Sequence, residues 1–206
     1  MTRDKDLGES LRMLAPPGIM VDHRLITCGD EHALLPEETS AFQRSAVEVR
    51  RASGAARIVA RGLIDQLGRK MAPLPRSPAG PPIWPKGILG SLAHDSRVAV
   101  AAVGTPERLR GVGIDVEPAA ALPSDLLDLV TTPRERAMIN CDPYRGRLFF
   151  VAKEAVYKAV FPLDRCFLDH HEVEVDIPSG KAIVRNSRSV DVRYCMSTHV
   201  VALAFF

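Results

Sequence analysis

Two carboxylates lie in the middle of GVGIDVEP, residues 111–118, a stretch that otherwise has the apolar character of a buried strand. Asp115 and Glu117 are two positions apart, and alternate residues of a strand point to the same face, so both side chains project together. Two negative charges this close raise each other's pKa unless a cation lies between them. For this pair taken alone, an exposed strand face near a turn is the simpler explanation.

A third carboxylate, Glu154, lies in FVAKEAVYK, residues 150–158, on a predicted helix that is mostly apolar. Lys153 precedes it and Lys158 follows one helical turn later. Taken alone, this is best explained as a Glu–Lys pair on a solvated helix face, worth roughly a few tenths of a kcal/mol. Three carboxylates from two elements, however, suit a hard cation such as Mg²⁺, and the lysines suit the phosphate oxygens that complete its coordination.

Hydrophobic periodicity predicts the strands that surround these side chains. Residues 19–26, 97–103 and 111–117 are expected to be strands. The segment 72–90 is rich in Pro and Gly, which favours an ordered loop that ends in a short strand near Ile88. From residue 171 onwards, apolar and polar residues alternate in four stretches, which predicts a meander of antiparallel strands.

Two helices are expected between residues 35 and 70. Pro36 favours a helix start, and interruptions are expected at Thr39–Ser40 and at Ser53–Gly54. The second helix, at about 54–68, should end with Gly68 as its C-cap. Its expected apolar face consists of Ala55, Ile58, Val59, Gly62, Leu63 and Leu67, with Arg50, Arg51, Arg57 and Arg61 on or beside the polar faces.

Further helices are expected in the second half of the chain. Ser124 is a candidate N-cap, and Pro133 behind Thr132 has the character of a first helical residue. The longest clean helical pattern covers 145–161 and is expected to stop at Pro162. Its apolar stripe consists of Phe149, Val156 and Val160, with Ala152 and Leu163 nearby.

Two stretches resemble each other in layout. HDSRVAVAAV (94–103) and MSTHVVALAFF (196–206) each combine a polar turn with a Val-Ala strand, and each follows a helix-bearing region. This internal similarity suggests two related halves, each a helix packed on a small sheet, although two short matches can also arise by chance.

Composition points to an ordinary globular protein. The chain has 206 residues, is 46% hydrophobic and 25% charged, and carries a net charge of +2, which is no nucleic-acid signature. No segment approaches a membrane span, and the charged N-terminus lacks a signal peptide's apolar region. The cysteines form no CxxC pair, so reduced thiols and a cytoplasmic location are expected. They are Cys28, Cys141, Cys166 and Cys195.

GIDVE followed by FxxKEAxxK resembles the paired signature of the 4′-phosphopantetheinyl transferases. PPIWPKGILGSLAH (81–94) is similar to the P-x-WP-x-G-x-x-GS-x-x-H segment of the enterobactin-synthetase-associated branch, a monomeric, two-half type like the surfactin-synthetase enzymes. KEAVYKAVFPL (153–163) is close to that branch, and residues 50–68 resemble its Arg-bearing helix, so the likeness runs from about residue 40 onwards. One departure is HDSRV, where the family often has an aromatic residue shortly after His94.

The resemblance implies an enzyme that transfers the 4′-phosphopantetheine arm of coenzyme A to a serine of an apo carrier protein and releases 3′,5′-ADP. Asp115, Glu117 and Glu154 match the acids that hold Mg²⁺, with Mn²⁺ as an alternative metal. Glu154 also matches the residue proposed to take the serine proton, although which acid serves as the base stays open. Lys153 and Lys158 match cations that neutralise coenzyme A phosphates.

The resemblance implies further coenzyme A contacts in the first half of the chain. Ser91 and His94 match the S-x-x-H pair, whose His reaches a phosphate. Arg50, Arg57 and Arg76 are candidates for the 3′-phosphate and adenine region, with solvated surface arginines as the alternative. The roles of Lys86 and Trp84 stay open. His170–His171 has no further ligand at fixed spacing and is interpreted as a polar strand entry.

The implied fold is α+β, a pseudo-twofold pair of similar α/β halves, each a helix on a small, mainly antiparallel sheet. The halves are expected at 1–108 and 109–206, with coenzyme A between them. The expected partners are coenzyme A and an apo acyl or peptidyl carrier, with no nucleic acid and no membrane span. Siderophore, polyketide and fatty-acid carriers all fit, the resemblance favours secondary metabolism such as nonribosomal peptide synthesis, and a monomer is expected. The alternative from another class is a coenzyme A-binding module without turnover, which would not need all three acids.

Overall fold

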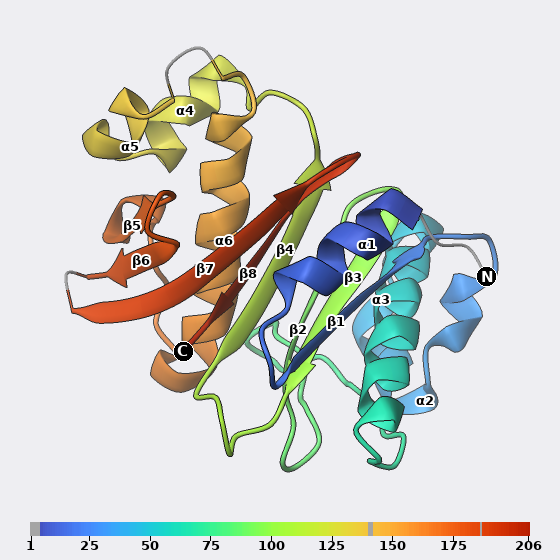
Figure 1. Cartoon of the computed structure of the whole chain (residues 1–206). Helices are drawn as coiled ribbons and strands as arrows, with labels where there is room; N and C mark the ends of the chain where they lie inside the picture. The colour runs from blue at the N-terminus through green and yellow to red at the C-terminus, as the bar shows by residue number, and fades with distance from the viewer. Residues whose placement is uncertain (1–4, 140–141, 186) are drawn as a thin grey trace.

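The computed structural model describes residues 5–139, 142–185 and 187–206, so Cys141 lies outside the described residues. It is a mixed α+β structure with two antiparallel sheets (Figure 1). One sheet has the strand order β1-β3-β2 and the other has the order β4-β8-β7-β6-β5. The predicted C-terminal meander is therefore confirmed. The strands are β1 Ile19–Leu25, β2 Leu89–His94, β3 Val98–Gly104, β4 Val112–Pro118, β5 Val173–Asp176, β6 Lys181–Val184, β7 Arg188–Met196 and β8 His199–Phe205.

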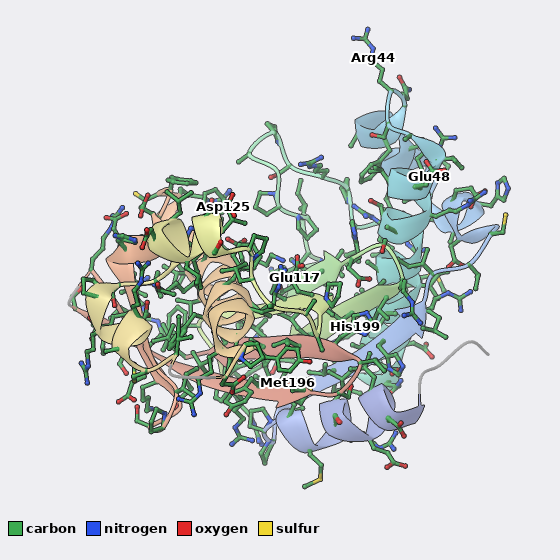
Figure 2. The ribbon with its side chains drawn as sticks, turned by 90° about the horizontal axis from the view of Figure 1, so that it is seen from above. Arg44, Glu48, Glu117, Asp125, Met196 and His199 are labelled. Atoms are coloured by element: carbon green, nitrogen blue, oxygen red, sulfur yellow. The ribbon has the colours of Figure 1, made fainter. Side chains whose placement is uncertain are left out.

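Helices cover both sides of this strand layer. The helix α3 packs on the first sheet and α6 on the second, while α1 lies against the opposite side (Figures 1 and 2). Within the described ranges, no helix combines the length and the apolar character that crossing a membrane requires. The helices are α1 Lys5–Leu14, α2 Pro36–Thr39, α3 Val47–Gln66, α4 Ser124–Val130, α5 Pro133–Ala137 and α6 Arg145–Asp164, with short 3₁₀ turns η1 Asp30–Ala33, η2 Ser40–Phe42 and η3 His170–Glu172.

Strand alternation explains how the layers are held together. In β3, Ala99 and Ala101 face α3, whereas Val98 and Val100 face a core shared with α1, β4 and β8. The two sheets meet along β2 and β4, where the backbone N–H of Ile114 donates to Ser91 Oγ at 3.0 Å. The shared core and this hydrogen bond join the two sheets into one structure.

The predicted break at Ser53–Gly54 is wrong, because α3 runs without interruption from Val47 to Gln66. Both residues are buried inside the helix, and a Cβ on Gly54 would collide with the backbone carbonyl of Asp30. Glycine at this position therefore allows η1 to approach the helix rather than ending it. The predicted C-cap is wrong by one residue, because Leu67 is the cap; Gly68 follows it with φ +67° and donates its N–H to Asp65 O, the left-handed turn that glycine favours after a helix.

The long helix α6 packs on the face of β4 that carries the acids. A Cβ on Gly113 would collide with the carbonyl of Ala155, so glycine permits a close helix–strand approach. The prediction that the helix stops at Pro162 is wrong, because the helix continues to Asp164 and ends at Arg165, whose φ is 53°. Proline removes a single backbone bond in this last turn, and Arg165 N still donates to Phe161 O at 2.9 Å.

The structure also tests the predicted helix caps and one residue of the predicted apolar stripe of α6. Thr132 caps α5 with Pro133 as the first helical residue, as expected. Ser124 is the first residue of α4 and Pro123 occupies the cap position, so the predicted Ser124 cap is wrong by one residue. Leu163 is 48% exposed, so it lies outside the buried apolar stripe of α6.

Each long helix contributes a buried cation to a buried glutamate. Glu38 accepts from Leu35 N and Leu74 N, and Arg61 Nη1 lies 3.1 Å from it. In the second half, Glu135 accepts from Thr132 N and Val175 N, and Lys153 Nζ lies 2.6 Å from it. The expected polar-face position is wrong for Arg57 and Arg61, since both are buried, 4% and 7% exposed, against Glu38.

Candidate functional site

The acids of GIDVE lie on the side of β4 that faces α6. Strand alternation places Gly113, Asp115 and Glu117 on this face, while Ile114 and Val116 enter the shared core. Asp115 is 8% exposed, and its Oδ1 accepts a hydrogen bond from Lys158 Nζ at 2.6 Å. Burial raises the pKa of Asp115, and Lys158 opposes that rise. The two signature motifs therefore meet directly.

Glu117 lies nearer the rim of the same face. Its carboxylate pairs with Arg147 of α6, Nη1 to Oε2 at 3.1 Å. Partial burial raises the pKa of Glu117, and the charge of Asp115 raises it further. Repulsion between the two acids, expected from their spacing, is thus present, and each acid meets a cation from α6.

Glu154 faces the same region from α6, one turn before Lys158. His170 Nε2 lies 3.1 Å from Glu154 Oε1, and this hydrogen bond lowers the pKa of Glu154, with Lys158 adding to the effect. The negative charge of Glu154 in turn raises the pKa of Asp115. Asp115 is therefore coupled electrostatically to Glu117 on its own strand and to Glu154 across the space between β4 and α6.

The donor atoms suit a divalent cation, but each acid already has a separate partner, a lysine, an arginine or a histidine. Carboxylate oxygens are the ligands that Mg²⁺ prefers. Burial is the main cause of the raised pKa of Asp115 and of Glu117, and neighbouring acids add to it, so a bound cation would offset the cost of ionising both groups. Among the described residues, however, no three His, Cys, Asp or Glu side chains are close enough together to hold a metal ion. A metal held by all three acids would require Lys158 and Arg147 to give way.

The first sheet contributes the end of β2. Ser91 is buried and accepts from Ile114 N, so it ties β2 to β4. His94 is the last residue of β2 and keeps access to solvent, yet neighbouring atoms crowd the ring. This desolvation lowers the pKa of His94, and the charge of Lys158 lowers it further.

The next residue, Asp95, forms a second tie between the sheets. Its Oδ1 accepts from Arg97 N and Val98 N and so closes the β2–β3 turn. Its Oδ2 lies 3.0 Å from His199 Nε2, and the two side chains are only 6% and 2% exposed. His199 pairs with Pro118, directly after Glu117, so this contact connects the His94 turn to the acid-bearing strand.

The three candidate arginines lie in different settings. Arg57 is buried and donates to Leu74 O and Ser53 O, yet its charge contributes to lowering the pKa of His94. Arg76 donates to Gly80 O within the Pro-rich loop, and Arg50 donates to Ser45 O before α3. The structure thus brings Arg57 towards His94, with Arg76 close enough to influence Arg57 electrostatically.

The expectation that Lys153 contacts coenzyme A phosphates does not fit its position. Lys153 is 1% exposed, pairs with Glu135 and donates to Val130 O and His170 O, each at 2.8 Å. Burial lowers its pKa despite this partner. The adjacent Glu154 and Lys153 therefore leave α6 in different directions, and only Glu154 faces the acids of β4.

The sequence did not predict Arg147 and His170 as partners of Glu117 and Glu154, or His199 as the partner of Asp95. The pair His170–His171 is visible in the sequence, but nothing in the sequence predicts that the η3 turn returns to α6. The segment is a short 3₁₀ turn before β5, close to the expected strand entry. His171 contacts Asp128 O instead, at 2.9 Å.

The site lies between the two helix-bearing halves. Figure 2 shows Glu117 in the middle, between the α4 side with Asp125 and the α3 side with Arg44 and Glu48, and His199 beside it. Two hollows of about 590 and 540 Å³ lie elsewhere, against α1. Neither is lined by the three acids, so we assign the site from its chemistry rather than from cavity size.

Comparison with known proteins matches two family models to successive parts of the chain. Residues 37–104 match the family described as 4′-phosphopantetheinyl transferase N-terminal domain, and residues 111–204 match the 4′-phosphopantetheinyl transferase superfamily. The chain is 40% identical over 145 residues to the 4′-phosphopantetheinyl transferase PptT of Mycobacterium tuberculosis, covering 68% of this chain and 64% of that protein. It is 38% identical to the 4′-phosphopantetheinyl transferase Npt of Nocardia iowensis, over 71% of this chain and 68% of that protein. It is 32% identical to the 4′-phosphopantetheinyl transferase Svp of Streptomyces mobaraensis, over 80% of this chain and 70% of that protein.

Proposed function

The chain belongs to the 4′-phosphopantetheinyl transferase superfamily, and from that premise we propose that it transfers the 4′-phosphopantetheine group of coenzyme A to a serine of an apo carrier protein. The serine oxygen bonds to the pantetheine phosphorus, the pyrophosphate bridge breaks, and 3′,5′-ADP leaves. The observation that carries the proposal is the contact between Lys158 and Asp115, 2.6 Å, with Glu154 one turn away. Cations and carboxylates together suit a pyrophosphate and its metal.

The residues of this chain have distinct proposed roles. Asp115, Glu117 and Glu154 would hold Mg²⁺ or Mn²⁺, a metal that neutralises the charge of the pyrophosphate. Lys158 would be released from Asp115 to bind phosphate oxygens, and His94 would approach a phosphate from the end of β2. Glu154 would accept the serine proton, which suits a carboxylate kept ionised by His170.

We further propose that Arg57 and Arg76 hold the 3′-phosphate and adenine end of coenzyme A, with Arg50 as a more distant candidate. Support for Arg57 comes from its electrostatic influence on His94 and from the Pro-rich loop that it anchors at Leu74. Ser91 would act through its bond to Ile114, which fixes β2 against β4.

A carrier-modification assay tests the function. We expect a panel of apo carriers, incubated with coenzyme A, Mg²⁺ and this protein, to contain members that gain the phosphopantetheine mass. Asp115→Ala should abolish the gain, whereas Asp191→Ala, which loses only the exposed pair with Lys181, should retain it. Coenzyme A binding without mass gain on any carrier would favour the binding module instead.

We also propose that residues 1–108 and 109–206 are pseudo-twofold halves. Support comes from the separate family matches at 37–104 and 111–204, and from similar local arrangements. In each half a short helix with Pro at its start, α2 or α5, carries a buried glutamate that pairs with a cation of the long helix. In each half the strand before the helices also pairs antiparallel with the last strand, β1 with β3 and β4 with β8.

Three finer assignments remain proposals. The segment PPIWPKGILGSLAH (81–94), with its Trp-Pro pair and its S-x-x-H motif, supports the enterobactin-synthetase-associated branch. A monomer is supported because one chain supplies both His94 at the end of β2 and the acids of β4 and α6. The free thiols of Cys28, Cys166 and Cys195 agree with a cytoplasmic location. The carrier itself, whether from siderophore, polyketide, nonribosomal peptide or fatty-acid synthesis, is identified by the same mass-gain panel.

A further inference from the structure

His170 lies at the start of η3, a short turn between α6 and β5 that is fixed by its own hydrogen bonds. Asp169 accepts from His171 N at 2.9 Å, and Glu172 accepts from Asp169 N at 3.0 Å. Arg185 pairs with Glu172 at 2.8 Å and ties the turn to the end of β6. The backbone that carries His170 is therefore held on both sides.

The residue itself is anchored to α6 at two further points. Its backbone carbonyl accepts from buried Lys153 Nζ at 2.8 Å. Its ring lies 5.7 Å from the ring of Phe150, one turn before Glu154 on the same helix. The position of the imidazole is thus fixed relative to α6 before its contact with Glu154 is considered.

The remaining contact is with a group of the site. His170 Nε2 lies 3.1 Å from Glu154 Oε1, and both side chains are about one-third exposed, 32% and 31%. A glutamate on a helix surface otherwise samples many rotamers, and ordering such a side chain costs conformational entropy. A fixed N–H donor selects one orientation and engages one carboxylate oxygen only.

We propose that His170 is a positioning residue that holds the Glu154 carboxylate in one orientation towards Asp115 and Lys158. The inference rests on the proposed transferase function, since it assigns Glu154 its partner in that site. His170 acts as a hydrogen-bond donor and takes no proton from the substrate. His171, its neighbour, has its Nε2 on the carbonyl of Asp128 and has no such role.

The test compares His170→Ala, His170→Gln and the matched control His171→Ala, after each is shown to unfold near the wild-type temperature. His170→Ala should lower kcat about 10- to 100-fold, as loss of an outer-shell partner does, with the KM for coenzyme A little changed. His170→Gln should restore most of kcat, because an amide N–H can donate from a similar place. His171→Ala should resemble the wild type. If His170→Gln is as inactive as His170→Ala, the imidazole does more than donate, and the proposal is overturned.

A double variant tests the dependence on Glu154. Glu154→Gln with His170→Ala should be no less active than Glu154→Gln alone, because the second change removes a partner that has lost its function. Fully additive losses would show that His170 acts elsewhere and would overturn the proposal.

A spectroscopic measurement separates this proposal from the proposed function. The ¹⁵N resonance of His170 Nε2 should shift in Glu154→Gln and stay unchanged in His171→Ala, whether or not any carrier is modified. Absence of pantetheine transfer together with this shift would reject the transferase function and retain the positioning contact. An unchanged resonance in Glu154→Gln would overturn the contact itself.

Discussion

Lys153→Met is expected to weaken folding while leaving coenzyme A binding intact. The change removes a buried cation whose Nζ lies 2.6 Å from Glu135 and donates to two carbonyls. Glu135, which is fully buried, keeps only the backbone donors of Thr132 and Val175. Leaving one member of a buried ion pair without its partner costs about 3–5 kcal/mol. In a chain of this size, that loss lowers Tm by roughly 6–20 °C.

Removing both charges should be less damaging than removing one. Burial lowers the pKa of Lys153 even beside Glu135, so the cost of desolvating the ammonium group exceeds the gain from its attraction to Glu135. Glu135→Gln with Lys153→Met removes the uncompensated charge and is expected to recover part of the lost stability. Arg61→Met, which leaves Glu38 with Arg57 at 3.6 Å, should be milder than Lys153→Met.

Urea unfolding followed by circular dichroism measures the stability of each variant, and calorimetry well below the transition measures coenzyme A affinity. Lys158→Met provides the contrast, because Lys158 is 29% exposed and faces Asp115 in the candidate site. It should lose coenzyme A affinity with a smaller loss of stability. The reasoning is refuted if Lys153→Met unfolds at the wild-type urea concentration while its coenzyme A affinity falls as in Lys158→Met.

Three further predictions concern the strands that form the site. Gly113→Ala should lower Tm strongly in a thermal scan, because the added Cβ meets the Ala155 carbonyl, and backbone cannot move aside cheaply. The pKa of Glu117 is raised in the folded protein, so its ionised carboxylate lowers the stability of the fold at pH values above its ordinary pKa of 4.5. In metal-free buffer, Glu117→Gln should therefore raise Tm at neutral pH. This gain in Tm should vanish as the pH falls below 4.5, where the carboxyl group is protonated in both the folded and the unfolded protein. Asp95→Ala removes the acceptor of His199 and should lower the urea-derived free energy of unfolding by about 1–3 kcal/mol, whereas the exposed neighbour Ser96→Ala should not.

The strands and the acid motif could be predicted because their signals are local. Alternation of apolar and polar residues gave β4 and the C-terminal meander, and a two-residue spacing placed Asp115 and Glu117 on one face. The break at Ser53–Gly54 was predicted wrongly because glycine there serves a contact with a distant carbonyl, not a turn. Local signals do not distinguish these two uses of glycine.

The partners of the acids depend on tertiary packing and could not be found from spacing. Lys153 and Glu154 are neighbours in sequence, but α6 turns one into the core and the other towards β4. From the sequence alone, Lys153 is predicted to lie on the surface, because its buried partner Glu135 is not known before the structure is. His170 reaches Glu154 only because η3 folds back onto α6, and the hydrogen bonds that hold η3 are not visible as a pattern.

The position of β8 has a consequence for the order of folding. β4 pairs with β8, and β8 also pairs with β7, so the acid-bearing strand finds its place in the second sheet only when residues 199–205 are present. Contacts so distant in sequence form slowly, since a long loop must close first. During synthesis, Asp115 and Glu117 therefore emerge well before their strand can be buried. The candidate site is expected to be among the last parts of the nascent chain to mature, and a ribosome-bound chain that stops before β8 should not bind coenzyme A.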